Sequence, residues 1–399
     1  MPLISFDDAR AQLLGTASPL TETATLALAD TYGKVLGADI CAPFDVPPFD
    51  NSAMDGYAVR ATDVTLPGIR MPVSQRIAAG ESPATLAPGS AARIFTGAPM
   101  PNGADTVLMQ EMCTADNGFV IVNEQPTAGQ HVRKRGHEIK TGRVVLAAGT
   151  RLSAAHLGLA ASLGLAALPI LHPLRVAIFF TGTELVAPGT PLAAGQIYNS
   201  NRFVMRGMLQ SIGAEIIDLG IIPDNFDATC AALSAAAQQA DVILTSGGMS
   251  VGEEDHVKAA VEKVGQLTTW KIAVKPGKPL AFGQVGKTPF IGLPGNPVSV
   301  WVAFSTIVLS YLQKRQGVAD YDVKRRHLPA GFGKRTGDRR EFLRVQIDDA
   351  GQLVLHTNQD SGALSSAAWA SGLADLPANS EIAAGQMIDY WPAPGFGQS

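Results

Sequence analysis

The stretch Asp241-Val-Ile-Leu-Thr-Ser-Gly-Gly-Met-Ser-Val-Gly-Glu-Glu-Asp-His256 decides the fold of the central part of this chain. Its apolar run, residues 242–245, is typical of a buried strand and ends at the Ser-Gly-Gly turn 246–248. Three acidic residues, 253–255, then open an expected helix. Paired glycines let a backbone approach a ligand closely, and free N–H groups at a helix start favour anions. The stretch therefore predicts a strand followed by an anion-binding turn.

Basic and Pro-Gly segments follow this stretch: Lys271, then Lys275-Pro-Gly-Lys278-Pro279, then Leu293-Pro-Gly-Asn-Pro297. Lysines reach an oxyanion as point charges, and nearby carboxylates can hold a metal ion that offsets phosphate charge. Each motif also has a simpler explanation, because turns are common and the acids 253 and 254 suit the helix dipole. Asp255 is the better functional candidate among the acids. Together the motifs indicate a site for a highly anionic ligand.

Strands and helices alternate between residues 174 and 316. The alternation favours an open α/β sheet with helices on both faces, in which ligands bind at the carboxyl ends of strands. Asn296 is a natural N-cap for the last helix, with Pro297 at its first position. The expected strands are Arg175–Phe180, Glu215–Ile221, Val242–Thr245 and Phe290–Leu293, and the expected helices are Asn201–Ile212, Asp227–Ala240, Glu254–Val264 and Val298–Gln313.

The flanking regions have other patterns. Residues 1–40 look mainly helical, with helical spacing over Asp7–Leu14 that we expect to continue over Thr23–Tyr32. Between residues 49 and 145 short strands alternate with Gly and Pro turns, and the turn 116–118 predicts a hairpin. After residue 320 the pattern is again β, and we expect Arg340–Ile347 to pair with Leu353–His356 and the tail beyond Pro392 to fray.

The composition is that of an ordinary globular protein. The chain has 399 residues, is 46% hydrophobic and 17% charged, and carries a net charge of −4, so no global basic field favours nucleic acid. Its three cysteines are far apart, which suits a reducing cytoplasm, and we expect no targeting segment. Residues 152–174 carry no charge, but their longest apolar part is shorter than the roughly 20 residues of a spanning helix. We expect a buried helix with Ser153 as its N-cap and Gly164 directly after its end, then a short strand, and no membrane contact.

Two common catalytic motifs are absent from the sequence. It contains neither GxGxxG nor HExxH, and its seven histidines are scattered. The segment Gly283–Thr288 lacks the spacing of a nucleotide-binding loop. The segment Asp50–Tyr57 lies where the chain enters the β-rich region, and we expect a polar turn with Met54 and Tyr57 buried.

These segments together resemble the molybdopterin molybdenumtransferase family, which is called MoeA in bacteria and the E domain in gephyrin. The resemblance covers nearly the whole chain in family order, and the set is specific although each motif alone is weak. The matching stretches are Pro47–Ala58, Phe95–Asp105, Thr181–Leu185, Gln196–Arg202, the Ser-Gly-Gly turn, Lys275–Pro279 and Leu293–Ser299.

The resemblance and the patterns above predict the fold class α/β plus β-rich domains. An open, three-layer α/β molybdopterin-binding module would span residues 173–319, with an inserted β-rich domain at 45–135 and a small β-barrel-like domain at 320–399. Residues 1–44 and 136–172 would form an N-terminal linker and helical domain. Family members are elongated homodimers, and their active site lies between the α/β domain of one subunit and domains of the other.

The resemblance also implies an activity. These enzymes take adenylylated molybdopterin and molybdate, place the metal on the dithiolene and release AMP, in the last step of molybdenum cofactor biosynthesis. Mg²⁺ is the expected cofactor. Molybdopterin adenylyltransferase and apo-molybdoenzymes or their chaperones are the partners that the resemblance suggests.

Site residues are implied one by one. Catalytic roles fall on Asp55, Glu184, Asp255, Lys271 and Lys275, and metal binding falls on Glu184 and Asp224. Substrate contacts fall on Thr96, Glu138, Ser246, Gly247, Gly248, Ser250, Lys278, Pro294, Asn296, Pro297 and Ser361. Thr183 stands where many members carry Asp, which leaves the metal site one carboxylate lighter, and the region beyond residue 361 matches least.

The chemistry of these residue types agrees with the reaction. The adenylate carries a pyrophosphate link, so a divalent cation on Glu184 and Asp224 would counter charge as AMP leaves. Molybdate is a tetrahedral dianion, which the lysines complement. Loss of its oxo groups as water requires protons, a task for Asp55 or Asp255.

Two rival functions stay open at this point. Molybdopterin adenylyltransferase shares the α/β module, but that enzyme is essentially the module alone, and ATP consumption separates the two. A scaffold or binding protein is the other class, because gephyrin's related domain anchors receptors; a scaffold would tolerate substitution of Asp55 or Lys275. The sequence leaves open molybdate or tungstate as the metal source, the identity of the cation and the apo-enzymes that receive the product.

Overall fold

The computed structural model describes residues 3–248 and 256–394. Two predicted site residues, Ser250 and Asp255, and the end of the predicted tail lie outside the described residues. The chain divides into two compact units. Unit 1 comprises Met1–Gly37, Gly149–Ala154 and Ala167–Ser399, and unit 2 comprises Ala38–Ala148 and Ala155–Ala166.

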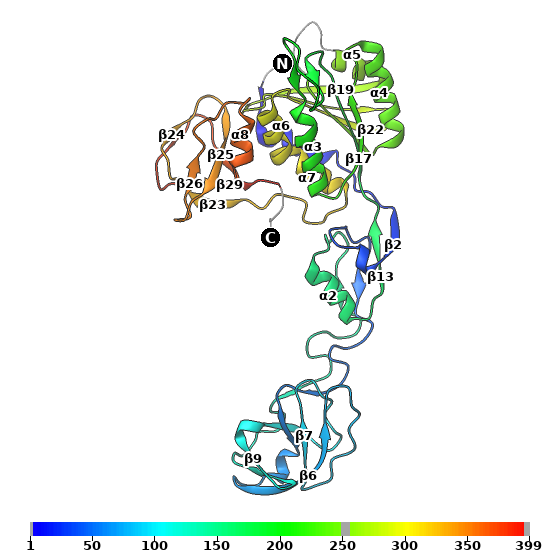
Figure 1. Ribbon diagram of the computed structural model, residues 1–399, viewed down its shortest axis with the longest axis vertical. Helices are drawn as coiled ribbons and strands as arrows, with labels where there is room; N and C mark the ends of the chain where they lie inside the picture. The colour runs from blue at the N-terminus through cyan, green and yellow to red at the C-terminus, as the bar shows by residue number, and fades with distance from the viewer. Residues whose placement is uncertain (1–2, 249–255, 395–399) are drawn as a thin grey trace. The chain divides into compact units, whose positions relative to one another are not determined.

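A seven-stranded sheet forms the centre of unit 1 (Figure 1), in the order β1-β19-β21-β22-β18-β14-β17. Strands β14, β17, β18 and β22 run parallel to one another, whereas β21 is antiparallel to both β22 and β19. The strands are β1 Leu3–Ile4, β14 Arg175–Phe180, β17 Glu215–Ile221, β18 Val242–Ser246, β19 Gly265–Ile272, β21 Pro279–Val285 and β22 Thr288–Leu293, and a two-stranded ladder of β15 Leu185–Val186 and β16 Ile197–Tyr198 follows β14.

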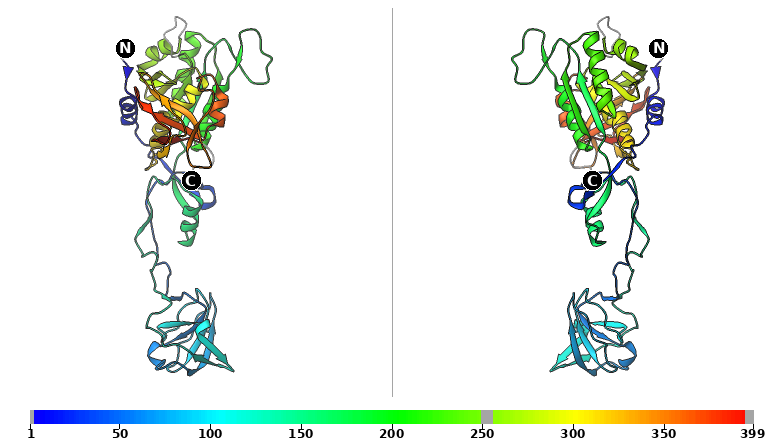
Figure 2. Two further views of the ribbon diagram at one scale, coloured as in Figure 1. Left: turned by 90° about the vertical axis from the view of Figure 1, so that its left-hand side faces the viewer. Right: turned by 90° about the vertical axis from the view of Figure 1, so that its right-hand side faces the viewer.

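Helices cover both faces of this sheet, because successive side chains of a strand point to opposite faces. Val176 and Ile178 on β14 join a core formed with α1, α3, α6 and α7, whereas Ala177 and Phe179 join a second core with α4 and α5. Figure 2 gives two side views of these layers. The helices are α1 Phe6–Gly15, α3 Ser200–Ser211, α4 Phe226–Gln239, α5 His256–Val264, α6 Pro297–Ala303 and α7 Leu309–Arg315. The predicted three-layer α/β module is confirmed.

The predicted strands and helices of this module are all present with close bounds, but one helix is not uniform. A π-helical turn, Phe304–Val308, lies inside the predicted helix Val298–Gln313 and separates α6 from α7. The hydroxyls of Ser305 and Thr306 donate to carbonyls four residues earlier, a pattern that bends helices. The sequence patterns also missed β1, β19 and β21, which lie on one side of the parallel strands.

Two predictions for the N-terminal part were wrong. Thr23–Ala27 forms strand β2, antiparallel to β13 (Ala167–Leu171), and does not continue a helix; the residues alternate with a period of two, which fits a pleated strand. The predicted helix after Ser153 exists as α2 (Ala154–Ser162), but Ala160 is its one buried residue. Alanine and glycine dominate this helix, so its apolar composition did not imply burial. The predicted strand after it is confirmed as β13.

The C-terminal part of unit 1 is a sheet in the order β20-β25-β27-β29-β23, with β26 paired to β25. The predicted pairing after the turn 348–351 is confirmed, because β25 and β26 are antiparallel. Leu343, Val345 and Tyr390 lie in its core. The elements are β20 Val274–Lys275, β23 Arg326–Pro329, β24 Lys334–Arg335, β25 Arg340–Ile347, β26 Leu353–Leu355, α8 Leu364–Trp369, β27 Gly372–Leu376, β28 Glu381–Ile382 and β29 Met387–Pro392.

Unit 2 is β-rich, with a six-stranded sheet in the order β8-β5-β7-β6-β10-β9. The predicted hairpin is present, since β9 and β10 are antiparallel and both Asn117 (φ 43°) and Gly118 (φ 84°) have the positive φ of a type I′ turn. Tyr57 is buried as expected, but Met54 lies in the turn before β5 and is 41% exposed. The strands are β3 Ile40–Cys41, β4 Asn51–Ser52, β5 Gly56–Val59, β6 Ile69–Ile77, β7 Ala91–Ile94, β8 Thr106–Met109, β9 Cys113–Asp116, β10 Phe119–Val122, β11 Val132–Arg133 and β12 Val144–Leu146.

The predicted fold class, an α/β module with β-rich domains, is confirmed. The four predicted domain ranges are finer than the two compact units and stay a prediction. Among the described residues, no helix has both the length and the apolar character needed to cross a membrane.

Candidate functional site

Loops from six neighbouring strands meet at one edge of the central sheet. The last residues of four parallel strands, Leu293, Ser246, Phe180 and Ile221, lie in one row across β22, β18, β14 and β17. The antiparallel strands bring the amino end of β21 and the carboxyl end of β19, with Lys271, to the same edge. The segments that the sequence predicted to bind an anion therefore follow strands that end together.

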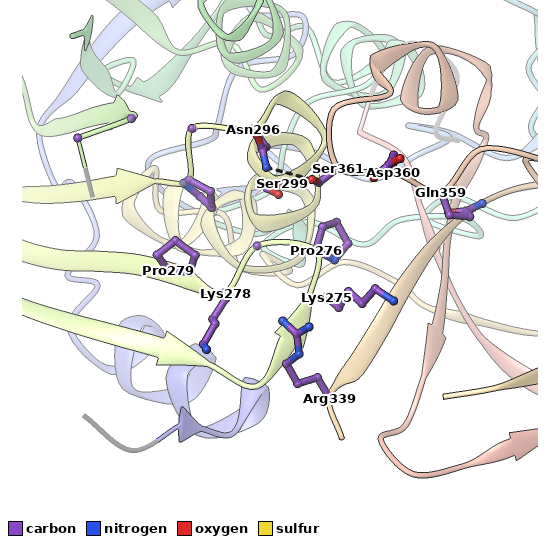
Figure 3. Close-up of a pocket in the computed structure, with 15 residues that line it drawn as sticks. Lys275, Pro276, Lys278, Pro279, Asn296, Ser299, Arg339, Gln359, Asp360 and Ser361 are labelled. Carbon is purple, nitrogen blue, oxygen red and sulfur yellow. Dashed lines mark hydrogen bonds between the residues drawn. The ribbon is translucent and has the colours of Figure 1, made fainter. Parts of the chain in front are cut away.

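A cavity of about 510 Å³ opens at this edge, beside the loops after β18 and β22 (Figure 3). In the close-up the basic side chains lie on one side and the hydroxyl and amide groups of the α6 start on the other. Its lining residues are Gly247, Gly248, Lys275, Pro276, Gly277, Lys278, Pro279, Pro294, Gly295, Asn296, Ser299, Arg339, Gln359, Asp360 and Ser361. The sequence predicted Gly247, Gly248, Lys275, Lys278, Pro294, Asn296 and Ser361, and the structure brings them together here.

This cavity is electropositive. Lys275, Lys278 and Arg339 contribute cations, and Asp360 is the one acid among its described lining residues. The Nζ atom of Lys275 lies 3.5 Å from the buried carboxylate of Glu341, whereas strong ion pairs have distances of about 2.8 Å. The Lys275 side chain is also 54% exposed, so it remains available to a ligand. Such a set of cations and hydroxyl groups suits an oxyanion.

The loop after β22 is tied to the C-terminal sheet. Asn296 occupies the predicted N-cap position of α6 and Pro297 begins the helix, but the Asn296 side chain makes no capping bond. Its Nδ2 instead donates to Ser361 Oγ at 3.0 Å, and the Val298 N–H donates to the Ser361 carbonyl at 3.2 Å. The hydroxyl of Ser361 is thereby held at the cavity wall beside the start of α6.

Ser246 is a support of the site rather than part of its surface. It is 2% exposed, and its Oγ accepts a hydrogen bond from Asn201 Nδ2 at 3.0 Å. The same Nδ2 donates to the Gly295 carbonyl at 2.7 Å. Asn201 lies in the first turn of α3, so it connects the turn after β18 with the loop after β22.

The two glycines after Ser246 bring the main chain to the cavity. Gly247 and Gly248 have φ values of 86° and 64°, which side-chain-bearing residues rarely adopt. A Cβ at Gly248 would lie 2.5 Å from the side chain of Val257 on α5. Both positions therefore require glycine, as the anion-binding turn predicted from the sequence does.

Glu184 and Asp224, the predicted metal ligands, follow β14 and β17 at the other end of the edge. The Glu184 carboxylate lies over Gly182, where a Cβ would be 2.5 Å from Oε2. Lys271 is the last residue but one of β19, and β19 lies five strand spacings of about 4.8 Å, or roughly 24 Å, from β17. Lys271 is not among the described residues of the cavity wall, and the described residues contain no group of three or more metal-ligating side chains. Carboxylates and lysines thus occupy different ends of one edge.

Unit 2 brings Asp55 and Thr96 together. Asp55 Oδ1 accepts hydrogen bonds from the Thr96 N–H at 2.8 Å and from its hydroxyl at 2.7 Å. These two bonds, with a smaller effect from the charge of Arg93, lower the pKa of the exposed Asp55 carboxyl below its usual 3.8. Glu138, the other site residue predicted in this unit, is exposed and lines a cavity of about 490 Å³ with Val46, Pro47, Asn51, Arg133 and His137.

Comparison with known proteins covers nearly the whole chain. Family models match residues 4–164 as the MoeA N-terminal region (domain I and II), 177–314 as a probable molybdopterin binding domain and 333–393 as the MoeA C-terminal region (domain IV). Molybdopterin molybdenumtransferase 2 of Mycobacterium tuberculosis is 37% identical over 395 residues, 96% of each chain. The chain belongs to the MoeA family of molybdopterin molybdenumtransferases.

Other relatives agree with this membership. The molybdopterin molybdenumtransferase of Haemophilus influenzae is 44% identical over 317 residues, which cover 79% of this chain and 78% of that protein. The crystal structure of the molybdopterin biosynthesis moeA protein from Pyrococcus horikoshii is 27% identical and superposes with a TM-score of 0.87, over 98% of this chain and 100% of that one. This MoeA-family chain is therefore a transferase of molybdenum cofactor biosynthesis.

Several residues that line or support this cavity were not predicted as site residues from the sequence. Asn201 lies inside a quoted stretch, and its position in the first turn of a helix that follows a strand could have identified it. Arg339 stands in the basic run before β25, but nothing local brings that run to the central sheet. The remaining lining residues that were not predicted as site residues are Gln359 and Asp360, and, inside quoted stretches, Pro276, Gly277, Pro279, Gly295 and Ser299.

Proposed function

We propose that this protein inserts molybdenum from molybdate into adenylylated molybdopterin and releases AMP. The observation that carries the proposal is the electropositive cavity at Lys275, Lys278 and Arg339. Molybdate is a tetrahedral dianion, and such a cavity complements both its charge and its acceptor oxygens. A volume of about 510 Å³ leaves room for this small ion beside the reacting end of a larger substrate.

The adenylylated substrate is long, and the row of loops offers it a matching length. Glu184 and Asp224 are hard oxygen donors of the kind that Mg²⁺ prefers, with water and substrate phosphates as the remaining ligands. A cation held there would counter the negative charge that develops as the phosphate–phosphate link takes up water and breaks. Thr183 adds no carboxylate, so we expect the substrate phosphates to contribute much of the cation's affinity.

Asp55 suits the role of a fixed negative charge, because a carboxylate with a lowered pKa is a weak proton acceptor at neutral pH. Because Thr96 lowers its pKa below 3.8, Asp55 is a carboxylate at neutral pH and has no proton to donate to a departing oxo group. Asp255 is the other acid that the sequence suggested as a proton source. Asp255 lies outside the described residues.

The proposal includes a cytoplasmic homodimer, because members of the family that the sequence resembles have their active site between two subunits. Molybdopterin adenylyltransferase would supply the substrate, and apo-molybdoenzymes or their chaperones would receive the product. Sedimentation equilibrium of the purified protein tests the assembly. The mass of two chains supports the homodimer, and the mass of one chain at micromolar concentration contradicts it.

The activity is tested by measuring AMP release from adenylylated molybdopterin, with molybdate and Mg²⁺ each present or omitted. We expect release that depends on molybdate and a product that activates an apo-molybdoenzyme. Consumption of ATP and free molybdopterin instead would favour adenylyltransferase activity. An inert protein whose Asp55→Asn and Lys275→Met variants behave like the wild type would favour a binding role.

A further inference from the structure

Arg202 carries a charge that the proposed reaction has not yet used. It lies in the first turn of α3, whose amino end is bonded through Asn201 to the end of β18 and the loop after β22 at the edge of the sheet that carries the cavity. Its Nε donates to Asp218 Oδ2 at 2.9 Å, and the side chain is 31% exposed. A guanidinium has five N–H donors, and among the described residues its two terminal amino groups have no hydrogen-bond partner.

The charges around Arg202 do not cancel. Asp218 Oδ2 also accepts from Arg206 Nη1 at 2.7 Å, and Asp218 Oδ1 accepts from the Gly220 N–H at 3.0 Å. One carboxylate therefore faces two guanidinium groups, and the cluster keeps a net positive charge. These partners outweigh the effect of burial and lower the pKa of Asp218, so its negative charge is constant at neutral pH.

Position distinguishes the two arginines. The Nη1 of Arg202 lies 4.0 Å from where a Cβ of Gly220 would stand, one residue before the end of β17. Arg206 follows one helical turn later, about 6 Å farther along α3 from its amino end. Of the two arginines, Arg202 is thus nearer to the edge of the sheet where the parallel strands end.

Arg202 lies between the oxyanion cavity and the predicted metal ligands Glu184 and Asp224. The preceding residue, Asn201, is bonded to the loops that form the oxyanion cavity. On the other side β17 pairs with β14, where the Glu184 carboxylate lies over Gly182. A ligand that extends from the cavity toward Glu184 and Asp224 passes the amino end of α3.

We propose that the terminal amino groups of Arg202 bind a phosphate of the adenylylated substrate, with Asp218 as the residue that orients them. The inference rests on the proposed function and deepens it, because it assigns the nucleotide end of the substrate to the α3 side of the edge. Arginine gives paired donors that match two phosphate oxygens, and a preset Nε bond reduces the freedom lost on binding. Arg202 acts only by binding the phosphate, and no covalent bond forms or breaks at its side chain.

The experiment compares Arg202→Ala and Arg202→Lys with the matched variant Arg206→Ala, which also removes one partner of Asp218. Binding of AMP and of adenosine to the full-length protein is measured for each by titration calorimetry with Mg²⁺ present. We expect Arg202→Ala to weaken AMP binding by about 10–100-fold, the effect of losing a charge-assisted contact. Arg202→Lys should retain part of the affinity, and Arg206→Ala should stay within about twofold of the wild type. Adenosine, which has no phosphate, should bind all four proteins equally.

Equal losses for Arg202→Ala and Arg206→Ala, or parallel losses for AMP and adenosine, would show that the cluster supports only the fold and would overturn the proposal. A wild-type protein that does not bind AMP would overturn it as well. Failure of the proposed function has a different signature: AMP binds and responds to Arg202, but no molybdate-dependent turnover occurs.

Discussion

The basic cavity of unit 1 and the turn of unit 2 that carries Asp55 differ in how firmly their charged side chains are held. Lys275 and Lys278 are exposed, and Lys275 is 3.5 Å from its nearest acid. Asp55 is equally exposed, but its Oδ1 accepts two hydrogen bonds from Thr96 at 2.8 and 2.7 Å. The cations can adjust to a ligand, whereas the carboxylate has its orientation and charge fixed beforehand. The difference teaches that the cavity can recognise charge with movable side chains, whereas the negative charge of Asp55 is held in one orientation before a ligand binds.

Replacement of the fixed carboxylate should have the largest effect. Asp55→Asn keeps the shape and one acceptor oxygen but removes the charge, so we expect molybdate-dependent AMP release to fall on the order of 100-fold or more. Asp63→Asn is the control, because Asp63 also accepts a main-chain hydrogen bond in unit 2, from Gly89 at 2.8 Å. Rates are measured at saturating substrate, with thermal melting as the check on folding. Equal rates for Asp55→Asn and the wild type would remove Asp55 from the mechanism.

Thr96→Val tests how the carboxylate is preset. It removes the hydroxyl bond and keeps the main-chain bond, so the pKa of Asp55 should rise toward 3.8. If ionised Asp55 is required, the acidic limb of the rate–pH profile then moves to higher pH, while the rate at pH 7 changes little. An unchanged acidic limb would mean that another group governs it.

Removal of one mobile cation should have a smaller effect. Lys278→Met keeps the apolar stem and removes the charge, and we expect molybdate binding to weaken by about 10–100-fold. Lys287→Met is the matched control, because Lys287 is exposed in the turn between β21 and β22, at the opposite end of β21 from the cavity. Equilibrium dialysis with molybdate measures both. Similar losses in the two variants would indicate a general charge effect and not a site.

The fold of the central module could be predicted because its strands are apolar runs bounded by turn residues. Val242–Ser246 and Arg175–Phe180 are buried on both faces, and this gives parallel strands a clear signal. The helix predicted over Thr23–Tyr32 is wrong, because the strand Thr23–Ala27 depends on pairing with residues 167–171, which are distant in sequence. Long-range pairing of this kind leaves only a weak local pattern.

The cavity could be predicted only in part, for a related reason. Gly247 and Gly248 carry a local signal, because their backbone conformation requires glycine. Arg339 carries no local signal. It reaches the cavity because it stands directly before β25, and β25 of the C-terminal sheet pairs with β20, the short strand between β19 and β21 of the central sheet. Asn201 is similar, because its two loop contacts depend on where α3 lies over the sheet edge.

Asn201 connects the two loops that present main chain to the cavity, and this connection can be broken with little change in shape. In Asn201→Asp the side chain can no longer donate to the Gly295 carbonyl, so two acceptors face each other. We expect molybdate affinity to fall about tenfold and amide exchange to quicken in segments 241–248 and 291–296. Asn225→Ala, which loses the N-cap bond of α4, serves as a control of similar structural cost. Unchanged amide exchange in those segments would show that the Asn201 hydrogen bonds do not hold the two loops in place.

Asp45 gives the smallest predicted effect and the sharpest control for Asp55. Its Oδ1 accepts from the N–H and the hydroxyl of Thr141, both at 2.9 Å, the same pattern that Thr96 makes with Asp55. These bonds, together with Arg135, lower the pKa of Asp45 to about 2. Because the folded pKa lies below the unfolded value, the stabilising contribution is present above pH 3.8 and is lost as the pH falls toward 2.

Asp45→Asn should therefore lower the Tm slightly at pH 7, and the difference from the wild type should shrink as the pH falls from 3.8 to 2. Its rate of AMP release per folded molecule should match the wild type, because Asp45 joins parts of unit 2 and lines none of the described cavities that contain predicted site residues. A large loss of rate would show that the hydrogen-bond pattern, and not its place in the molecule, marks a functional acid. Asp45 and Asp55 would then have to be explained together, since threonine presets both carboxylates in the same way.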